Sequence, residues 1–190
     1  MKNRTSKLIQ TALMAALCYV SFTFLQIKIP VPGGDATSIH IGNAFCVLAA
    51  LFLGGTYGGL AGAVGMTIAD LMDPVYILYA PKTFILKFCI GLIAGFIAHK
   101  CANISKSHDK KYIIKWSALA SIGALAFNIV FDPLVGFLYK QYILGLPQSA
   151  AATLAKLNAV ATSINAVIST ILVVILYTAL KPLLEKAKLI

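Results

Sequence analysis

The chain has 190 residues, of which 59% are hydrophobic and only 12% are charged, and its mean hydropathy is +0.87. About 25% of the residues of an average soluble domain are charged, so this composition excludes an ordinary soluble domain and predicts an integral membrane protein. The four cysteines form no Cys-x-x-Cys pair, so neither a disulfide framework nor a metal site is expected.

The net charge of +10 is unevenly distributed. Eleven of the 16 Lys and Arg residues fall in the N-terminal tail, in the segment 100–115 or in the C-terminal tail, where Asp109 and Glu185 are the only acids. An excess of basic residues marks the cytoplasmic loops of membrane proteins. We therefore expect both termini and the segment 100–115 in the cytoplasm, contact of these lysines with membrane lipid, and no nucleic-acid partner.

Six apolar runs predict an all-α fold of six transmembrane helices that form a single membrane domain over residues 1–190. The runs cover about 8–27, 40–53, 56–72, 82–99, 116–139 and 153–180. The second run is short enough to be a re-entrant or strongly buried segment. Asp132-Pro133 interrupts the fifth run, and the proline is expected to kink or end the helix there.

The segment 28–39, KIPVPGGDATSI, separates the first two runs. Pro30, Pro32 and the Gly33-Gly34 pair favour turns or extended backbone over helix. Under the expected topology, this loop lies outside the cell.

Small residues repeat along the third and fourth runs. Gly54, Gly58 and Gly62 are four residues apart, and Gly91 and Gly95 repeat the spacing. Small residues allow membrane helices to approach closely, so these two runs are expected to pack together and to hold the polar stretch between them.

Ala12, Ala15 and Ala16 give the first run a smooth face near its cytoplasmic end. Such a face serves either packing within the bundle or docking of another membrane protein. The sequence leaves both possibilities open.

Polar groups inside a bilayer are costly, about 2.5–3.5 kcal/mol for a central charge on insertion scales, so they usually face a cavity. Several share a helix face near the expected outer surface, which predicts a pocket open to the outside. Lys87 could instead pair with Asp70 or Asp132, and His40 could cap a helix. The candidate substrate-binding residues are His40, Asn43, Asp70, Tyr79, Lys87, Asn128, Asp132, Asn158 and Asn165.

Common catalytic motifs are absent. The chain contains no G-x-x-x-x-G-K-[ST], H-E-x-x-H or G-x-S-x-G sequence, so neither ATP hydrolysis by a phosphate loop nor these hydrolase mechanisms are expected. An intramembrane aspartyl protease that uses Asp70 and Asp132 is the one enzymatic alternative, and neither residue has a Gly-x-Gly-Asp context. We expect no enzymatic activity, no cofactor and no metal.

Two stretches resemble the substrate-binding S components of energy-coupling factor (ECF) vitamin transporters. They are TALMAALCYV, with its Ala-x-x-x-Ala face, and IHIGNAFCVLAALFLGGTYGGLAGAVGMTIADLM followed by YAPKTFILKFCIGLIAGFIA. The second is similar to the branch that includes hydroxymethylpyrimidine and pyridoxine S components, although Asn43 stands where that branch often has Asp. The similarity covers residues 8–100 well.

The resemblance implies a multi-pass protein of the bacterial plasma membrane that captures a vitamin outside and partners with a transmembrane T component and two ABC ATPases. It also implies that Ala12 and Ala16 contact the T component. Pyridoxine or hydroxymethylpyrimidine is the expected ligand, because the outer mouth is nearly neutral, amide-rich and aromatic. The alternatives are another vitamin, such as pantothenate or riboflavin, and a solitary secondary transporter.

Overall fold

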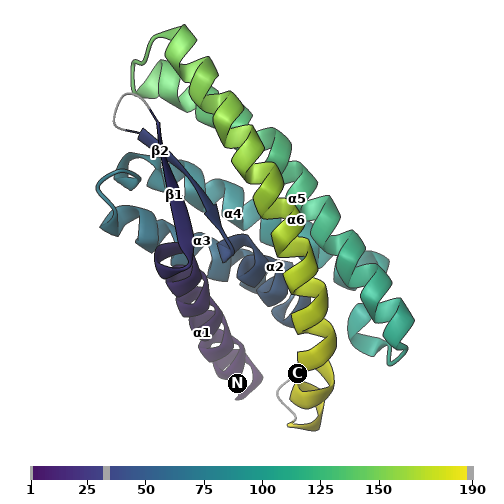
Figure 1. Cartoon of the computed structure of the whole chain (residues 1–190). Helices are drawn as coiled ribbons and strands as arrows, with labels where there is room; N and C mark the ends of the chain where they lie inside the picture. Colours follow the sequence, from purple (N-terminus) through teal and green to yellow (C-terminus); the bar gives the residue numbers. More distant parts are fainter. Residues whose placement is uncertain (1, 32–34, 188–190) are drawn as a thin grey trace.

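The computed structural model describes residues 2–31 and 35–187, which form six α-helices and one two-stranded antiparallel hairpin (Figure 1). Pro32, Gly33 and Gly34, where we expected turns or extended backbone, lie outside the described residues, as does Lys188 of the basic tail. The helices and strands are α1 (Lys2–Phe24), β1 (Gln26–Val31), β2 (Asp35–His40), α2 (Gly42–Leu53), α3 (Gly55–Met72), α4 (Ala80–Gly95), α5 (Lys110–Leu138) and α6 (Gln148–Lys186).

The predicted loop between the first two helices is a β-hairpin. Gln26 lies opposite His40, and the register continues to Val31 opposite Asp35. Pro30 is tolerated because a two-stranded sheet has only edge strands, which leave one backbone edge unpaired. The hairpin also corrects the end of the first helix, which stops at Phe24 and not near Ile27.

α2 is the buried centre of the bundle. Ten of its 12 residues are buried, and it packs against α1, α3, α4 and α6. Its apolar composition on every side is typical of a helix enclosed by other helices. The short run is therefore a strongly buried helix.

The glycines bring α3 against three different helices. A Cβ at Gly58 would overlap the backbone of Ala50 in α2, and one at Gly91 in α4 would overlap the backbone of Gly59 in α3. Gly65 approaches the carbonyl of Ala15 in α1. Small residues thus set the distances between the helices around the buried centre. Gly54, which joins α2 to α3, adopts φ +91°, a backbone conformation that favours glycine.

Four helical segments of the described chain are long and apolar enough to cross a membrane: Arg4–Phe24, Ile77–Cys101, Lys110–Ile143 and Gln148–Lys186. α2 and α3 are not among them, so a count of six spans stays a prediction. We expected Pro133 to kink or end the helix, and α5 continues through it, so the helix does not end there. Proline is better tolerated in membrane helices, where neighbouring groups satisfy the freed carbonyl.

The chain termini lie at one end of the bundle, together with the connection that precedes α5 (Figure 1). The β-hairpin lies toward the other end, and β2 packs against α6. The three basic segments are therefore separated from the hairpin along the length of the helices.

Candidate functional site

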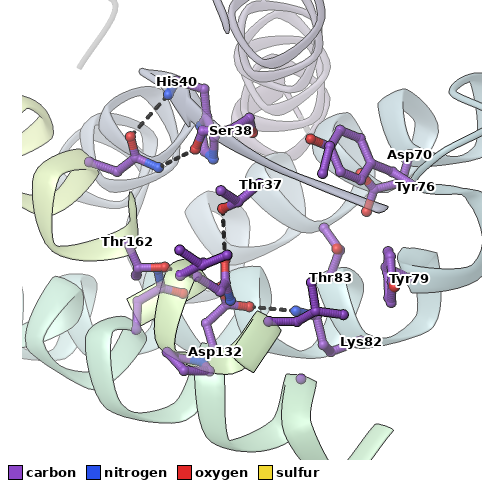
Figure 2. A pocket seen from close by; sticks show the side chains of 18 of the residues that line it. Thr37, Ser38, His40, Asp70, Tyr76, Tyr79, Lys82, Thr83, Asp132 and Thr162 are labelled. Atoms are coloured by element: carbon purple, nitrogen blue, oxygen red, sulfur yellow. Dashed lines mark hydrogen bonds and ion pairs between the residues drawn. The ribbon is translucent and has the colours of Figure 1, made fainter. Parts of the chain in front are cut away.

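A cavity lies beneath the β1–β2 hairpin and is bordered by residues from every α-helix (Figure 2). The cavity and its opening together hold about 860 Å³. Ligand sites are typically concave, with mostly apolar walls and a few converging polar groups, and this cavity has that construction.

All nine candidate substrate-binding residues line this cavity. His40 comes from β2, Asn43 from α2 and Asp70 from α3. α5 and α6 contribute two residues each. The remaining two come from the turn before α4 and from α4 itself. The full set is His40, Asn43, Asp70, Tyr79, Lys87, Asn128, Asp132, Asn158 and Asn165.

The lining also contains polar residues that the sequence analysis did not select. The spacing of Asn158, Thr162 and Asn165 places Thr162 on the same helix face as the two asparagines, although Thr162 is not among the nine selected residues. The hairpin residues gave no such signal, because side-chain alternation has meaning only once a strand is assigned. The unselected polar residues are Thr37, Ser38, Tyr76, Lys82, Thr83, Lys140 and Thr162.

Asp132 of α5 is the most fully paired group in the cavity. One carboxylate oxygen accepts a hydrogen bond from Lys82 Nζ at 2.8 Å, and the other accepts from Asn158 Nδ2 at 2.9 Å and Thr162 Oγ1 at 3.4 Å (Figure 2). Asp132 thereby joins α4, α5 and α6. An ion-paired Asp132 gives no support to a pair of aspartates that share a proton.

Lys87 and Asp70 are buried without ion-pair partners. Lys87 is 6% exposed, and its ammonium makes no hydrogen bond or ion pair with any described residue. Asp70 is 2% exposed, and its Oδ2 has no hydrogen-bond partner among these residues. In the described structure Lys87 therefore pairs with neither Asp70 nor Asp132. The ion-pair partner of Asp132 is Lys82.

Three further side chains of the lining carry a buried polar atom without a hydrogen-bond partner in the described chain. These atoms are Asn43 Oδ1, Asn128 Oδ1 and Tyr76 OH. With Asp70 Oδ2, four of the ten buried side-chain atoms without a hydrogen-bond partner among the described residues belong to this cavity lining. Most buried side-chain polar atoms in proteins are hydrogen-bonded, so these four require an explanation.

The hairpin is tied to α6 by two asparagines. Asn165 Oδ1 accepts a hydrogen bond from the backbone N–H of His40, and its Nδ2 donates to the carbonyl of Ser38, both at 3.0 Å. Thr37 Oγ1 donates to Asn158 Oδ1 at 3.4 Å. Asn158 therefore contacts both the hairpin and the carboxylate of Asp132.

The His40 imidazole lies at the start of α2. Its Nδ1 accepts a hydrogen bond from the backbone N–H of Gly42 at 3.2 Å, and its ring meets Phe22 edge to face at a centroid distance of 4.6 Å. Burial lowers the pKa of His40 to about 3, so the imidazole is neutral at physiological pH. His40 thus combines the capping role with a place in the cavity wall.

Asp35 of β2 lies between the hairpin and the helices at the cavity mouth. Its carboxylate accepts hydrogen bonds from Tyr79 OH at 2.9 Å and from Lys140 Nζ. Lys140 also lies 5.1 Å from the centre of the Tyr79 ring, within the range of a cation–π interaction. Asp73, just after α3, accepts a hydrogen bond from the backbone N–H of Val75 and pairs with Lys28 outside this cavity.

The three alanines of α1 differ in their surroundings. Ala12 and Ala16 are exposed, whereas Ala15 is partly buried where α1 meets Gly65 of α3. Part of this face therefore serves internal packing, and Ala12 and Ala16 remain at the surface.

Comparison with known proteins gives the chain a family. Residues 2–182 match the model of the family described as ECF-type riboflavin transporter, S component. A protein of Pyrococcus woesei described as "Uncharacterized protein in gap 3'region" is 29% identical over 87 residues, which cover 46% of this chain and 57% of that relative. The chain thus spans little more than half the length of the curated relative it matches. No solved structure matches the chain.

The family describes a component of a transporter and not a class of enzymes. Its match covers residues 2–182, which include all of the described bundle except the last residues of α6. This chain is therefore a multi-pass membrane protein that belongs to the family of ECF-type riboflavin transporter S components.

Proposed function

We propose that this chain is the substrate-capture subunit of an ECF-type importer and binds a small, water-soluble vitamin or vitamin precursor in the cavity beneath the hairpin. The observation that carries the proposal is the group of buried polar atoms without partners that belong to Asn43, Asp70, Tyr76 and Asn128. Burying a polar group without a hydrogen bond is unfavourable, so these atoms favour a polar ligand that completes their hydrogen bonds.

Pyridoxine and hydroxymethylpyrimidine are the ligands that we test first. Each combines a flat ring with hydroxyl and ring-nitrogen groups that suit amides and carboxylates. Phe22, Tyr76 and Tyr79 in the cavity lining offer aromatic surface to such a ring. The family name is compatible with riboflavin, and pantothenate is a further alternative, so both join the ligand panel.

We propose that the cavity opens to the outside of a bacterial plasma membrane and that both termini lie in the cytoplasm. The termini and the connection before α5, which carry most of the lysines, lie together at the end away from the hairpin (Figure 1). Positive charge concentrates on the cytoplasmic side of membrane proteins, which supports this orientation.

We propose a transmembrane T component and two ABC ATPases as partners, as the resemblance to S components implies. Ala12 and Ala16 are exposed on α1, where small side chains would permit close approach of a second membrane protein. Ala15 contributes less to this docking face, because it packs against α3.

Calorimetry of the purified protein against pyridoxine, hydroxymethylpyrimidine, riboflavin and pantothenate tests the proposal. We expect one of them to bind, and mass spectrometry of co-purified small molecules should identify the same compound. Absence of binding by the whole panel, together with no co-purified vitamin, would contradict the proposed function. Uptake into liposomes by the isolated chain would instead support a solitary secondary transporter.

A further inference from the structure

The charged side chains around the cavity balance one another among the described residues. Lys82 pairs with Asp132, and at the mouth Lys140 pairs with Asp35. Asp70 and Lys87 remain, one carboxylate and one ammonium, each without an ion-pair partner. Asp35 is adjacent to the cavity and not part of its lining, but it pairs with the lining residue Lys140, so these six charged side chains together have no net charge. The two unpaired charges, Asp70 and Lys87, have opposite signs.

We propose that the cavity selects a ligand without net charge, which donates a hydrogen bond to Asp70 and accepts one from Lys87, and that it rejects the phosphate ester of the same ligand. This inference rests on the proposed function and specifies the charge class of its substrate.

The physical reason is the penalty for burying an unbalanced charge. A phosphate monoester carries a charge of about −1.5 to −2 at neutral pH. Lys87 is the one cavity lysine of the described chain that lacks an ion-pair partner, so a bound ester would leave negative charge uncompensated beside Asp70. An uncompensated buried charge is strongly unfavourable.

A neutral ligand avoids this penalty. It needs a hydroxyl or N–H group near Asp70 and a lone pair near Lys87, and hydrogen bonds to charged groups are stronger than those between neutral groups. The neutral amides of Asn43 and Asn128 then complete the contacts without adding charge.

Matched pairs of ligands test the inference on the wild-type protein. Calorimetry compares pyridoxine, hydroxymethylpyrimidine and riboflavin with their monophosphate esters, and it includes pantothenate as a carboxylate. We expect one neutral parent to bind, its ester to bind about 100-fold more weakly or less, and pantothenate not to bind. The acetate ester of the bound parent is the control for size, and it should bind better than the phosphate ester.

Two variants separate charge from shape. Asp70→Asn gives the cavity one excess positive charge and should raise the affinity of the phosphate ester relative to the parent by about tenfold or more. Asp73→Asn, at a carboxylate near the end of α3 but outside the cavity, should leave that ratio unchanged. If the affinity of the phosphate ester relative to the parent were the same in both variants, a charge-based mechanism would be contradicted.

The outcomes distinguish the two proposals. Binding of a phosphate ester or of pantothenate as tightly as a neutral parent overturns the charge selection and leaves the capture function intact. If the acetate and phosphate esters are excluded equally, the charge selection is also overturned, because the size of the ester group then explains the exclusion. If none of these compounds binds, both proposals are contradicted.

Discussion

Lys82 of α4 and Asp132 of α5 form a 2.8 Å ion pair on the cavity wall, and both side chains are largely buried, at 11% and 14% exposure. The pair belongs to a chain of contacts, because Asn158 joins Asp132 to Thr37 of the hairpin. The hairpin that lies over the cavity is thus connected, through Asn158 of α6, to the ion pair between α4 and α5.

Removing one member of this pair should destabilise the protein. Asp132→Ala leaves the Lys82 ammonium without its partner, and breaking a buried ion pair in this way costs about 3 kcal/mol or more. We expect a clear drop in the midpoint of thermal unfolding in detergent and weaker ligand binding.

The exposed pair of Lys28 and Asp73 provides the control. Lys28 is 42% exposed, so Asp73→Ala should change the melting temperature far less. The double variant Lys82→Met/Asp132→Leu should recover stability without recovering ligand affinity, because apolar side chains can replace a buried ion pair. If Asp132→Ala and Asp73→Ala lowered the melting temperature equally, the cavity ion pair would stabilise the protein no more than the exposed pair does.

The close approach of α3 and α4 gives a second prediction. Gly91→Ala places a methyl group where the backbone of Gly59 lies, so the helices must separate. Overpacking of this kind typically destabilises by about 1–3 kcal/mol. The matched control is Gly123→Ala, whose methyl group meets only the end of the Ile97 side chain, which can move. The control should melt at or above the wild-type temperature, since alanine is the better helix former.

The helices could be predicted from the sequence, whereas the β-hairpin could not. Long apolar runs and small-residue spacing indicate membrane helices because both follow directly from the bilayer as solvent. In the segment 26–40 the prolines and glycines indicate only that a helix is excluded. Strand pairing depends on a partner strand and on α6, through Asn158 and Asn165, and no local pattern encodes that contact.

The cavity was predictable because polar residues are rare in an apolar chain, and each of the nine selected residues lines it. Their mutual pairing was not predictable. Lys82 and Lys87 lie five residues apart on α4, and only the packing of α5 decides which of them reaches Asp132. Sequence spacing places both lysines near the cavity, whereas the distances between helices assign the ion pair.

The buried His40 gives a prediction for pH. Its native pKa of about 3 lies below the ordinary value of about 6.5, so the unfolded chain binds a proton at His40 before the native protein does. Below about pH 6.5 this group therefore lowers stability by roughly 1.4 kcal/mol per pH unit, and above that pH it has no effect. Thermal unfolding of the wild type and of His40→Asn should differ in slope between about pH 6.5 and pH 4.5. The variant should lose less stability on acidification, and parallel curves would contradict a neutral, buried imidazole.

The surface of α1 gives the last prediction. Ala12→Trp and Ala16→Trp add bulk at exposed positions, so the fold and ligand affinity should remain close to wild type while uptake by the assembled transporter is lost. Ala15→Trp should behave differently, because Ala15 is partly buried where α1 meets Gly65 of α3, and it should lower the melting temperature of the isolated chain. Calorimetry, thermal unfolding and vitamin uptake in cells that contain the partner subunits measure the three effects separately. If Ala12→Trp and Ala16→Trp lost ligand binding together with uptake, this face would serve internal packing, and the T component would have to dock elsewhere on the bundle.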